Sequence, residues 1–464
     1  MSGEGLNTAA ARWAAGLTLD SVPPDVVESM RLRILDLIGV MLAARPLPLV
    51  AAATRAAMAA DPGSGAAILG DAAPVSPMAA SFVNGVMSAV LEYDDTHIES
   101  FIHPNAPVVA VAFPEAQRRR LPGRLLLEAA LVGSELTCRL GRITPVRLHT
   151  LGFHPTAVFG VFGGVYALGK LRGLAAPVMA DAIGAAGSLS AGLNASFEDG
   201  SSTKMMHVGF AATGALRAVA LAEQGISGPA PVFEGRFGWF RSHIQGRDDL
   251  HFDALCKDLD ETWEVLNVAS KLYPCAFTMM PHIEAALTLR ADHDIRPEQI
   301  EGVTCLIGKR SFATMCEPVE DKRRPSTTWH GRISLQHTVA EALVRGRMDK
   351  DAYAEESLRD PVINAIADKV EYHDDPATDA LRSGGTVRLR LRDGRELEHR
   401  IDDMRGTRRN PLTREDVVTK FQTNVRGVLR QDIADRAVEQ VLRLEQLEDS
   451  ALLFDALSSR QATG

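Results

Sequence analysis

Apolar side chains recur at steps of three and four residues along the first half of the chain. Between residues 22 and 44 they fall at Val27, Met30, Ile34, Leu37, Ile38 and Met41. This spacing places them on one face of an amphipathic helix. Similar segments, rich in Ala, Leu and Gly, lie at residues 51–60, 75–91, 124–140, 157–171, 177–192 and 209–224. Because small residues let helices pack closely, the first half of the chain is predicted to be mainly helical.

The pattern changes after about residue 268. Residues 302–309 and 385–392 are predicted to be strands, and the second is followed by the turn Asp393-Gly394 and a further run at 396–401. An Asp-Gly turn between two such runs is typical of a β-hairpin. Helical patterns lie between the two strands, at residues 281–291 and 334–345. The middle of the chain is therefore predicted to have mixed α+β structure.

The last part of the chain is predicted to be helical again. Thr413 is expected to cap a helix in the stretch that starts at Asn410, and the helical pattern continues to about Leu457. The simplest arrangement is a mainly α fold with a large helical domain built from both chain ends, residues 1–267 and 406–464. A smaller α+β lid domain, residues 268–405, is inserted between them.

Length, charge and cysteine usage narrow the class of protein. The chain has 464 residues, which suits two domains, and a formal net charge of -9 at pH 7. An acidic chain offers no basic surface for nucleic acid, and it needs a local cationic pocket if it binds anions. The five cysteines are never spaced as C-x-x-C. This argues against a disulfide framework and against a closed zinc or iron-sulfur site.

No membrane or secretory segment is predicted. The N-terminal sequence lacks the basic start and apolar core of a secretory signal. The longest uncharged runs, residues 72–91 and 148–169, contain polar residues, proline and several glycines, so they are predicted to be buried helices rather than membrane spans. We therefore expect a cytoplasmic protein with neither a membrane nor a nucleic acid as its partner.

Four polar stretches carry the candidate chemistry, and the first is the densest. It runs Glu92-Tyr93-Asp94-Asp95-Thr96-His97 and resumes at His103-Pro104-Asn105. Histidines and carboxylates so close together fit a metal site. They fit equally a histidine base that a carboxylate holds in one tautomer. A capped helix end followed by a polar loop would explain the same residues without a function.

The second and third stretches each place a histidine beside a small-residue helix. GFHPT puts His154 at a predicted helix start, where it either points into a cleft or has a structural role. The glycines of Gly160-x-x-Gly163-Gly164 follow no strand, so the dinucleotide-binding fingerprint is not met. In the third stretch, Lys204 and His207 would share one helix face among apolar neighbours that indicate burial.

The fourth stretch, KLYPC, contains Lys271 and Tyr273 and lies at the change from helical to mixed structure. Ligands commonly bind at such domain junctions. Cys275 lacks a Cys-His signature and is predicted to be structural. The four stretches together suit a small polyanion, whose carboxylates the cations hold while a histidine or lysine transfers a proton at the neighbouring carbon. Clustered cations lower one another's pKa, which favours a neutral base near pH 7.

The order of these stretches resembles one family almost from end to end. The motifs are YDDTH…HPNAPV, GFHPT, EDGSSTKMMHVGFAATG, GPAPVFEGRFG, KLYPC and NPLTREDVVTKF, spread over roughly residues 5 to 450. They resemble the MmgE/PrpD family, which includes 2-methylcitrate dehydratases, cis-aconitate decarboxylases and iminodisuccinate epimerases. The resemblance implies a homodimer of two-domain subunits, with a helical domain and an α+β lid. It also implies chemistry without a metal or an organic cofactor.

The resemblance assigns several residues to an active site between the domains. Positions that line the family's active site match Thr96, His103, His154, Lys204 and Lys271, with an acidic position at Glu92. Three departures stand out. The cis-aconitate decarboxylases have a histidine where this chain has Ala276, and many members have one near Met280, two residues from His282. Where members often have a lid tyrosine this chain has His337, so His337 or His282 is predicted to replace other lid residues.

The main hypothesis is a cofactor-independent lyase of the 2-methylcitrate dehydratase type, or an isomerase, acting on a small di- or tricarboxylate. His103 and His154 would handle the proton, and Lys204 and Lys271 would bind carboxylates or stabilise an enediolate-like intermediate. The residues predicted to orient or bind the substrate are Glu92, Asp94, Thr96, His207, Tyr273, His282 and His337.

Three alternatives stay open at this point. The chain could be a cis-aconitate decarboxylase-like or an iminodisuccinate epimerase-like enzyme. It could be a polycarboxylate-binding protein without catalysis, since its lid residues are altered. It could also be a metal hydrolase that uses Asp94, Asp95, His97 and His103.

Overall fold

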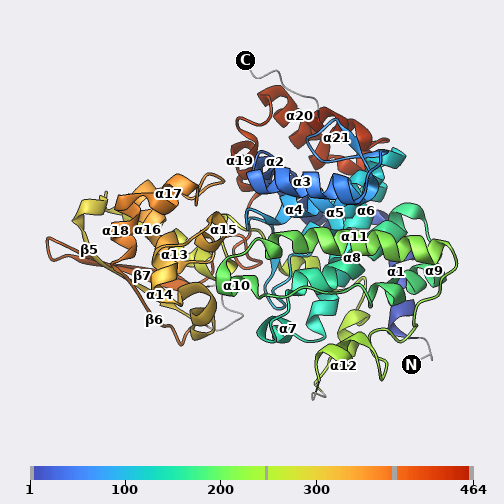
Figure 1. Ribbon diagram of the computed structural model, residues 1–464, viewed down its shortest axis with the longest axis horizontal. Helices are drawn as coiled ribbons and strands as arrows, with labels where there is room; N and C mark the ends of the chain where they lie inside the picture. Colours follow the sequence, from blue (N-terminus) through green and yellow to red (C-terminus); the bar gives the residue numbers. More distant parts are fainter. Residues whose placement is uncertain (1–4, 246–248, 379–383, 459–464) are drawn as a thin grey trace.

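The two ends of the chain form a helical domain, and the middle of the chain forms a smaller α+β lid beside it (Figure 1). The computed structural model describes residues 5–245, 249–378 and 384–458. The predicted fold class, mainly α with an inserted lid, is confirmed. The boundaries placed at residues 268 and 405 stay a prediction.

Long helices from the first half of the chain build the helical domain. They are α1 (Leu6–Gly16), α2 (Pro24–Ala44), α3 (Pro48–Ala60), α4 (Pro77–Ala89), α5 (Asn105–Arg119), α6 (Gly123–Arg142), α8 (Pro155–Arg172), α9 (Ala176–Ala186) and α11 (Thr203–Glu223). The shorter helices are α7 (Arg147–Thr150), α10 (Ser196–Asp199) and α12 (Trp239–His243). Helix α9 ends before the predicted residue 192, with Gly187 as its C-cap, and α11 begins before the predicted residue 209. The sequence patterns did not predict α1 or α5.

Helix α8 lies at the centre of this domain, buried along almost its whole length and in contact with α5, α6, α9 and α11. Two of its glycines allow the close approach. A Cβ atom added at Gly163 would lie 2.0 Å from Oγ1 of Thr137, and one at Gly164 would lie 2.7 Å from Cβ of Ala215. These glycines therefore serve helix packing, in line with the sequence argument against a nucleotide-binding loop.

The C-terminal helices close over the N-terminal ones, as Figure 1 shows for the red and blue segments. They are α19 (Arg414–Val425), α20 (Gln431–Leu442) and α21 (Ala451–Ser458). The predicted cap is present, because the Thr413 hydroxyl accepts a hydrogen bond from the backbone N–H of Asp416. Helix α19 packs on α2, and Nζ of Lys420 lies 2.6 Å from Oδ1 of Asp36.

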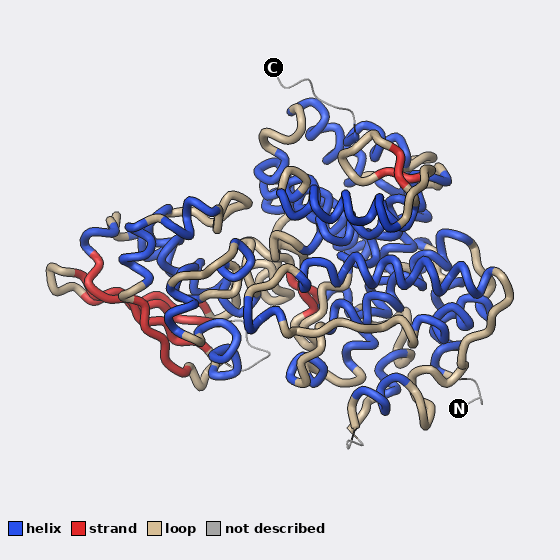
Figure 2. Tube along the Cα trace, in the orientation of Figure 1, coloured by secondary structure: helices blue, strands red, loops and turns tan. Residues whose placement is uncertain are grey.

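The lid is built around a four-stranded sheet (Figure 2). The strands β5 (Ile300–Ile307), β6 (Val370–Asp374), β7 (Gly385–Leu391) and β8 (Glu396–Ile401) lie in the order β6-β5-β7-β8. β6 is parallel to β5 and the other pairs are antiparallel, so the predicted β7–β8 hairpin is confirmed. The lid helices are α13 (Met280–Asp292), α14 (Val319–Arg323), α15 (Thr328–Gly331), α16 (Leu335–Arg345), α17 (Glu355–Arg359) and α18 (Pro361–Ala367).

Two adjacent segments join the lid to the helical domain. β4 (Val268–Ala269) pairs with β3 (Thr96–His97), and the N–H of Ser270 donates a 2.9 Å hydrogen bond to the carbonyl of Gly406. Gly406 has a φ of +97°, and a Cβ atom there would lie 2.0 Å from the Ser270 carbonyl oxygen. The lid is thus connected next to the polar stretch that starts at Glu92.

The apolar helices of the helical domain are buried to different degrees. Among the described residues, α11 is the one helix that is long and apolar enough to cross a membrane by itself, and 67% of that segment is buried. Helices α2 and α3 pass the same test only as a pair bent by 92°. The predicted buried helices at residues 72–91 and 148–169 correspond to α4, α7 and α8.

Candidate active site

A cavity of about 850 Å³ lies between the helical domain and the lid. The helical domain and the junction contribute Glu92, Thr96, His103, His154, Lys204 and Lys271 to its wall, and the lid contributes residues 307–311. All four polar stretches therefore supply side chains to the same cavity. Asp94 and His207 lie directly behind the wall, in contact with residues that line it.

Two buried lysines share one carboxylate at the base of the cavity. Nζ of Lys204, in the first turn of α11, contacts Oε1 of Glu92. Nζ of Lys271 lies 3.4 Å from Oε2 of Glu92, 3.1 Å from its carbonyl oxygen and 4.0 Å from Oδ1 of Asp94. Lys271 is fully buried, and the ring of Trp329 in the lid lies 6.0 Å from Nζ of Lys204. A substrate carboxylate entering here would share these ammonium groups with Glu92.

Burial lowers the pKa of both lysines. For Lys204 the pKa is well below its ordinary value, first because of burial and then because of the nearby charge of Lys271. For Lys271 burial also lowers the pKa, and the carboxylate of Asp94 opposes the shift. A lysine with a lowered pKa can transfer a proton near neutral pH as well as bind an anion.

His103 is held in one tautomer. Its Nδ1 lies 2.7 Å from the Asp95 carbonyl oxygen, 3.1 Å from Oγ1 of Thr96 and 3.7 Å from Oδ2 of Asp94. Because a carbonyl oxygen can only accept, Nδ1 carries the hydrogen and Nε2 keeps its lone pair. Burial lowers the pKa of the ring, and Asp94 opposes that shift. Nε2 is therefore the ring nitrogen of His103 that can accept a proton.

His154 and His207 form a second imidazole pair. Their Nδ1 atoms are 3.0 Å apart, so one ring donates a hydrogen bond and the other accepts it. Burial lowers the pKa of His207 to about 4, helped by the charge of Lys204. Burial is the main reason that the pKa of His154 lies well below its ordinary value, and the charge of His207 is the second. Nε2 of His154 is buried and has no hydrogen-bond partner among the described residues, so it is available to a bound molecule.

Part of the strained backbone of this protein lies at the cavity. Three residues of its wall have a positive φ without being glycine: Glu92 at +50°, Phe101 at +53° and Val146 at +60°. Such conformations cost about 1 to 3 kcal/mol each and persist only where the surroundings impose them. The carboxylate that holds both lysines is thus fixed by the fold around it.

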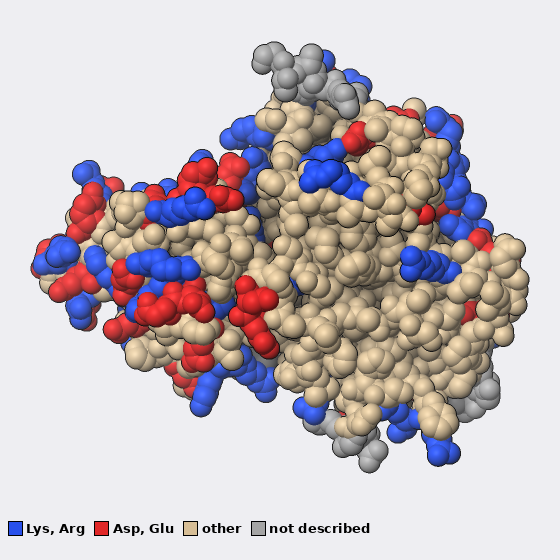
Figure 3. Space-filling model, viewed as in Figure 1, with Lys and Arg blue, Asp and Glu red and all other residues tan. Residues whose placement is uncertain are grey.

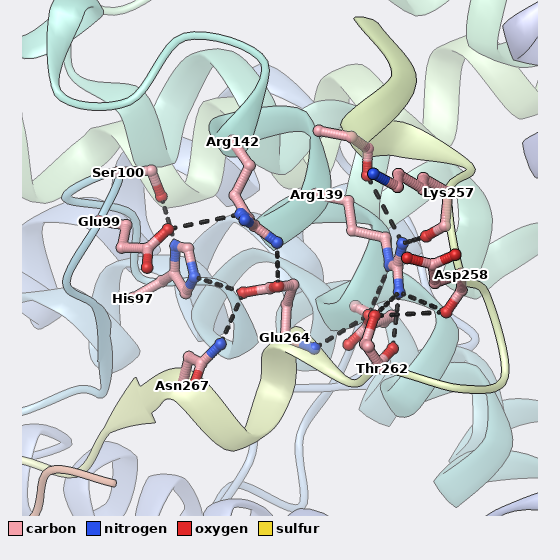
Figure 4. A network of polar contacts seen from close by, with 12 residues as sticks. His97, Glu99, Ser100, Arg139, Arg142, Lys257, Asp258, Thr262, Glu264 and Asn267 are labelled. Atoms are coloured by element: carbon pink, nitrogen blue, oxygen red, sulfur yellow. Dashed lines mark hydrogen bonds and ion pairs between the residues drawn. The ribbon is translucent and has the colours of Figure 1, made fainter. Parts of the chain in front are cut away.

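The metal site considered for the first stretch is not assembled. Nε2 of His97 lies 3.3 Å from Oε2 of Glu264, and Asp95 binds Arg33 and Asn105, so neither joins Asp94 and His103. The described residues do hold one cluster that could bind a metal by distance, His97 with Glu99 and Glu264 (Figure 4). The guanidinium of Arg142 contacts both carboxylates of that cluster, 3.4 Å from Glu99.

This network fixes the elements that carry the site. Figure 4 shows His97, which follows Thr96, tied to Glu264 in the segment that leads to β4 and Lys271. Beside it, the buried Arg139 donates hydrogen bonds of 2.6 Å to the carbonyls of Lys257 and Thr262. The contacts of this network are therefore explained by its structural role, which is to hold these segments together.

Three predicted residues lie elsewhere. Tyr273 is half-buried and does not line the cavity. His282 is buried in the lid, where its Nε2 lies 2.9 Å from the Leu306 carbonyl and Gly385 packs against the ring. His337 is buried on α16, 3.4 Å from Glu341. Both histidines thus sit in the lid interior instead of the predicted place facing the substrate, because their helices turn them toward the core.

Several residues that the sequence did not single out also line the cavity. Among them are Arg147, His149, Lys309 and Arg310. Arg147 and His149 precede the GFHPT stretch, and the other two directly follow β5. Their spacing in the sequence does not mark them as functional, because only the position of the lid opposite α7 brings them to one cavity.

Comparison with known proteins identifies relatives over the whole length. Family models match residues 8–250 (MmgE/PrpD N-terminal domain) and residues 273–446 (MmgE/PrpD C-terminal domain). A cis-aconitate decarboxylase of Aspergillus terreus is 26% identical, with 98% of this chain and 96% of that protein covered. The cis-aconitate decarboxylases of Mus musculus and Homo sapiens are 27% and 28% identical, with 81% and 82% of this chain and 78% and 79% of those proteins covered.

Proposed function

The chain belongs to the MmgE/PrpD family, and from that premise we propose that it is a lyase acting on a small di- or tricarboxylate by proton transfer next to a carboxylate. One observation carries the proposal. Two buried lysines with lowered pKa and two neutral histidines converge on a single cavity, beside a strained glutamate that holds both lysines. These groups can bind the anion and move the proton without a cofactor.

The residues divide the work by their chemistry. Lys204 and Lys271 hold the carboxylate next to the reacting carbon and stabilise the negative charge that develops on it. Nε2 of His103 takes the proton from that carbon, and Thr96 and the Asp95 carbonyl keep the ring oriented. His154, whose Nε2 has no hydrogen-bond partner among the described residues, lines the same cavity and serves as the second proton carrier.

In a dehydration, the base removes the carbon proton, the electron pair forms the double bond, and the hydroxyl leaves as water with a proton from the acid. We place this reaction first because Ala276 lines the cavity where cis-aconitate decarboxylases carry a histidine by resemblance. The 2-methylcitrate dehydratase type is therefore the first candidate.

Decarboxylation is the second candidate because three similar proteins are named cis-aconitate decarboxylase. There the C–C bond breaks, carbon dioxide leaves, and the electron pair left on carbon takes a proton from the acid. Lys204 and Lys271 could stabilise the charge in either reaction. An epimerisation would return the proton to the opposite face of the same carbon.

Proton NMR in deuterated water tests the proposal and separates these reactions. Purified protein, treated exhaustively with a chelator, is incubated with 2-methylcitrate, citrate, cis-aconitate and a racemisable iminodisuccinate. We expect deuterium incorporation or conversion of at least one compound, and Lys204→Ala should lose it. Stabilisation by these anions in a melting assay without any exchange would favour a binding protein instead. Activity that chelation abolishes would favour a metal enzyme.

We also propose that the protein is a homodimer formed through the face over α3 and α11. This face carries few charged side chains (Figure 3). Helix α11 also carries Phe210, which is 51% exposed and packs against Phe82 with ring centres 5.5 Å apart. A second copy of the chain would bury the Phe210 ring. Light scattering should give twice the 50.0 kDa chain mass. Phe210→Glu should give monomers, and a monomeric wild type would contradict the proposal.

A further inference from the structure

Three cations line the cavity in addition to the two lysines that hold Glu92. Arg147 comes from α7 in the helical domain, and Lys309 and Arg310 come from the lid segment that follows β5. Both domains thus contribute positive charge to the same space. A substrate that fills the cavity would meet these groups as well as Lys204 and Lys271.

Arg147 is the most informative of the three, because its charge is left without a partner. Its Nε is buried and makes no hydrogen bond, and the described residues give its guanidinium no carboxylate within ion-pair distance. Two buried arginines, by contrast, have partners for their guanidinium groups: Arg139 binds Glu135, and Arg332 donates to the Pro274 carbonyl. A half-buried guanidinium without a partner is costly unless a ligand completes it.

The local structure fixes Arg147 in this position. The preceding residue, Val146, is β-branched and has a φ of +60°, a conformation that such residues rarely adopt. His149, on the same short helix, packs between Phe101 and Phe197, with ring centres 5.2 and 6.1 Å away. The short helix is therefore held by the packing of His149, and Arg147 lines the cavity from the same helix.

The lid side of the cavity also keeps its cations free of carboxylates. Lys309 and Arg310 are exposed and form no ion pair among the described residues. Two acids on the same wall are already engaged: Asp374 accepts a 3.0 Å hydrogen bond from the backbone N–H of Lys309, and Asp375 pairs with Arg400 at 2.9 Å. The side-chain charges of Lys309 and Arg310 are thus available to an anion.

We propose that Arg147, together with Lys309 and Arg310, binds a second carboxylate of the substrate, remote from the carboxylate held by Lys204 and Lys271. This inference rests on the proposed function and specifies its substrate as a compound with at least two separated carboxylates. A guanidinium binds a carboxylate through two parallel N–H donors, which fixes direction as well as charge. The remote contact would hold the reacting carbon against His103 and disfavour monocarboxylates.

The test measures binding of a carboxylate that does not react. Tricarballylate, a saturated tricarboxylate without a hydroxyl group, is titrated calorimetrically into the full-length protein at fixed ionic strength, with butyrate as the monocarboxylate. Arg147→Gln should weaken tricarballylate binding about 10- to 100-fold, the loss expected for a charge-assisted hydrogen bond. It should leave butyrate binding unchanged within about threefold. Lys309→Gln combined with Arg310→Gln should also weaken tricarballylate binding.

A matched control separates the subsite from general charge effects. Arg347 is a lid arginine that does not line the cavity, and Arg347→Gln should leave tricarballylate binding unchanged. Equal tricarballylate affinity in Arg147→Gln and wild type, or no binding to wild type, would overturn the subsite. An equal loss of affinity for tricarballylate and butyrate would also overturn the subsite. Circular dichroism verifies that each variant is folded.

The failure of the subsite can be told from the failure of the proposed function. Turnover of the NMR panel by wild type with unchanged KM in Arg147→Gln would leave the lyase in place and remove the subsite. Arg147-dependent binding of tricarballylate without any turnover would keep the subsite and remove the lyase. If both hold, KM rises in Arg147→Gln and kcat falls as well, because the reacting carbon is held less well against His103.

Discussion

Replacing Lys204 by methionine should lower both stability and turnover, and a second substitution should restore only the stability. The ammonium group of Lys204 contacts Oε1 of Glu92, whose side chain is buried. A charge-assisted hydrogen bond of this kind contributes about 1.5 to 3 kcal/mol. Lys271 still lies 3.4 Å from the other carboxylate oxygen. We therefore expect the free energy of unfolding to fall by about 2 kcal/mol, toward the lower end of that range.

The catalytic effect should be larger. If Lys204 stabilises the charge that develops on the substrate carboxylate, its loss should reduce kcat by about 10²- to 10³-fold, as for removal of a single oxyanion donor. Lys204→Met combined with Glu92→Gln removes the uncompensated carboxylate, so most of the lost stability should return. Turnover should stay low, because no cation has been put back.

The assay pairs denaturant unfolding, followed by two independent probes, with turnover of the substrate found by NMR. Wild type, both single variants and the double variant form a cycle that isolates the coupling between the two residues. Near-normal kcat in Lys204→Met would refute the role of Lys204. Recovery of turnover together with stability in the double variant would show that the lysine acts only by neutralising Glu92.

Three further predictions concern the pH dependence of stability and turnover and the junction with the lid. Because burial lowers the pKa of His207 from 6.5 to about 4, the folded protein favours its neutral form. The neutral form of His207 should contribute about 3 kcal/mol to the free energy of unfolding. This contribution should be complete above pH 6.5 and disappear as the pH falls through 4, and the loss of stability between these pH values should be smaller in His207→Gln, as measured by acid unfolding. Turnover should fall on the alkaline side below pH 10.5, where Lys204 loses its proton; a limb at or above that value would contradict the lowered pKa. Gly406→Ala should destabilise the protein more than Gly394→Ala in thermal unfolding. Both glycines have a positive φ, +97° and +90°, so the backbone strain is similar, but a Cβ atom meets a backbone oxygen only at Gly406. Equal losses would refute the steric argument.

Much of the fold could be predicted from the chain, because it depends on local pattern. The period of apolar residues in α2, the Asp393-Gly394 turn between β7 and β8 and the Thr413 cap are properties of neighbouring residues, and the structure contains all three. Helix α5 escaped prediction because Pro114 in its interior is unfavourable in a helix, yet nearly all of its residues are buried against neighbours that compensate.

The candidate site was predictable only in part. The sequence alone determined which chemical groups are present and in what order: the lysines, histidines and acids of the four stretches. Tertiary structure decided which of them meet. It brought Lys204 and Lys271 to Glu92 across 112 and 179 residues of chain, turned His282 and His337 into the lid interior, and left Arg147 facing the cavity without a carboxylate. The reason is physical: side-chain direction, burial and tautomer depend on contacts between distant elements, which no local pattern encodes.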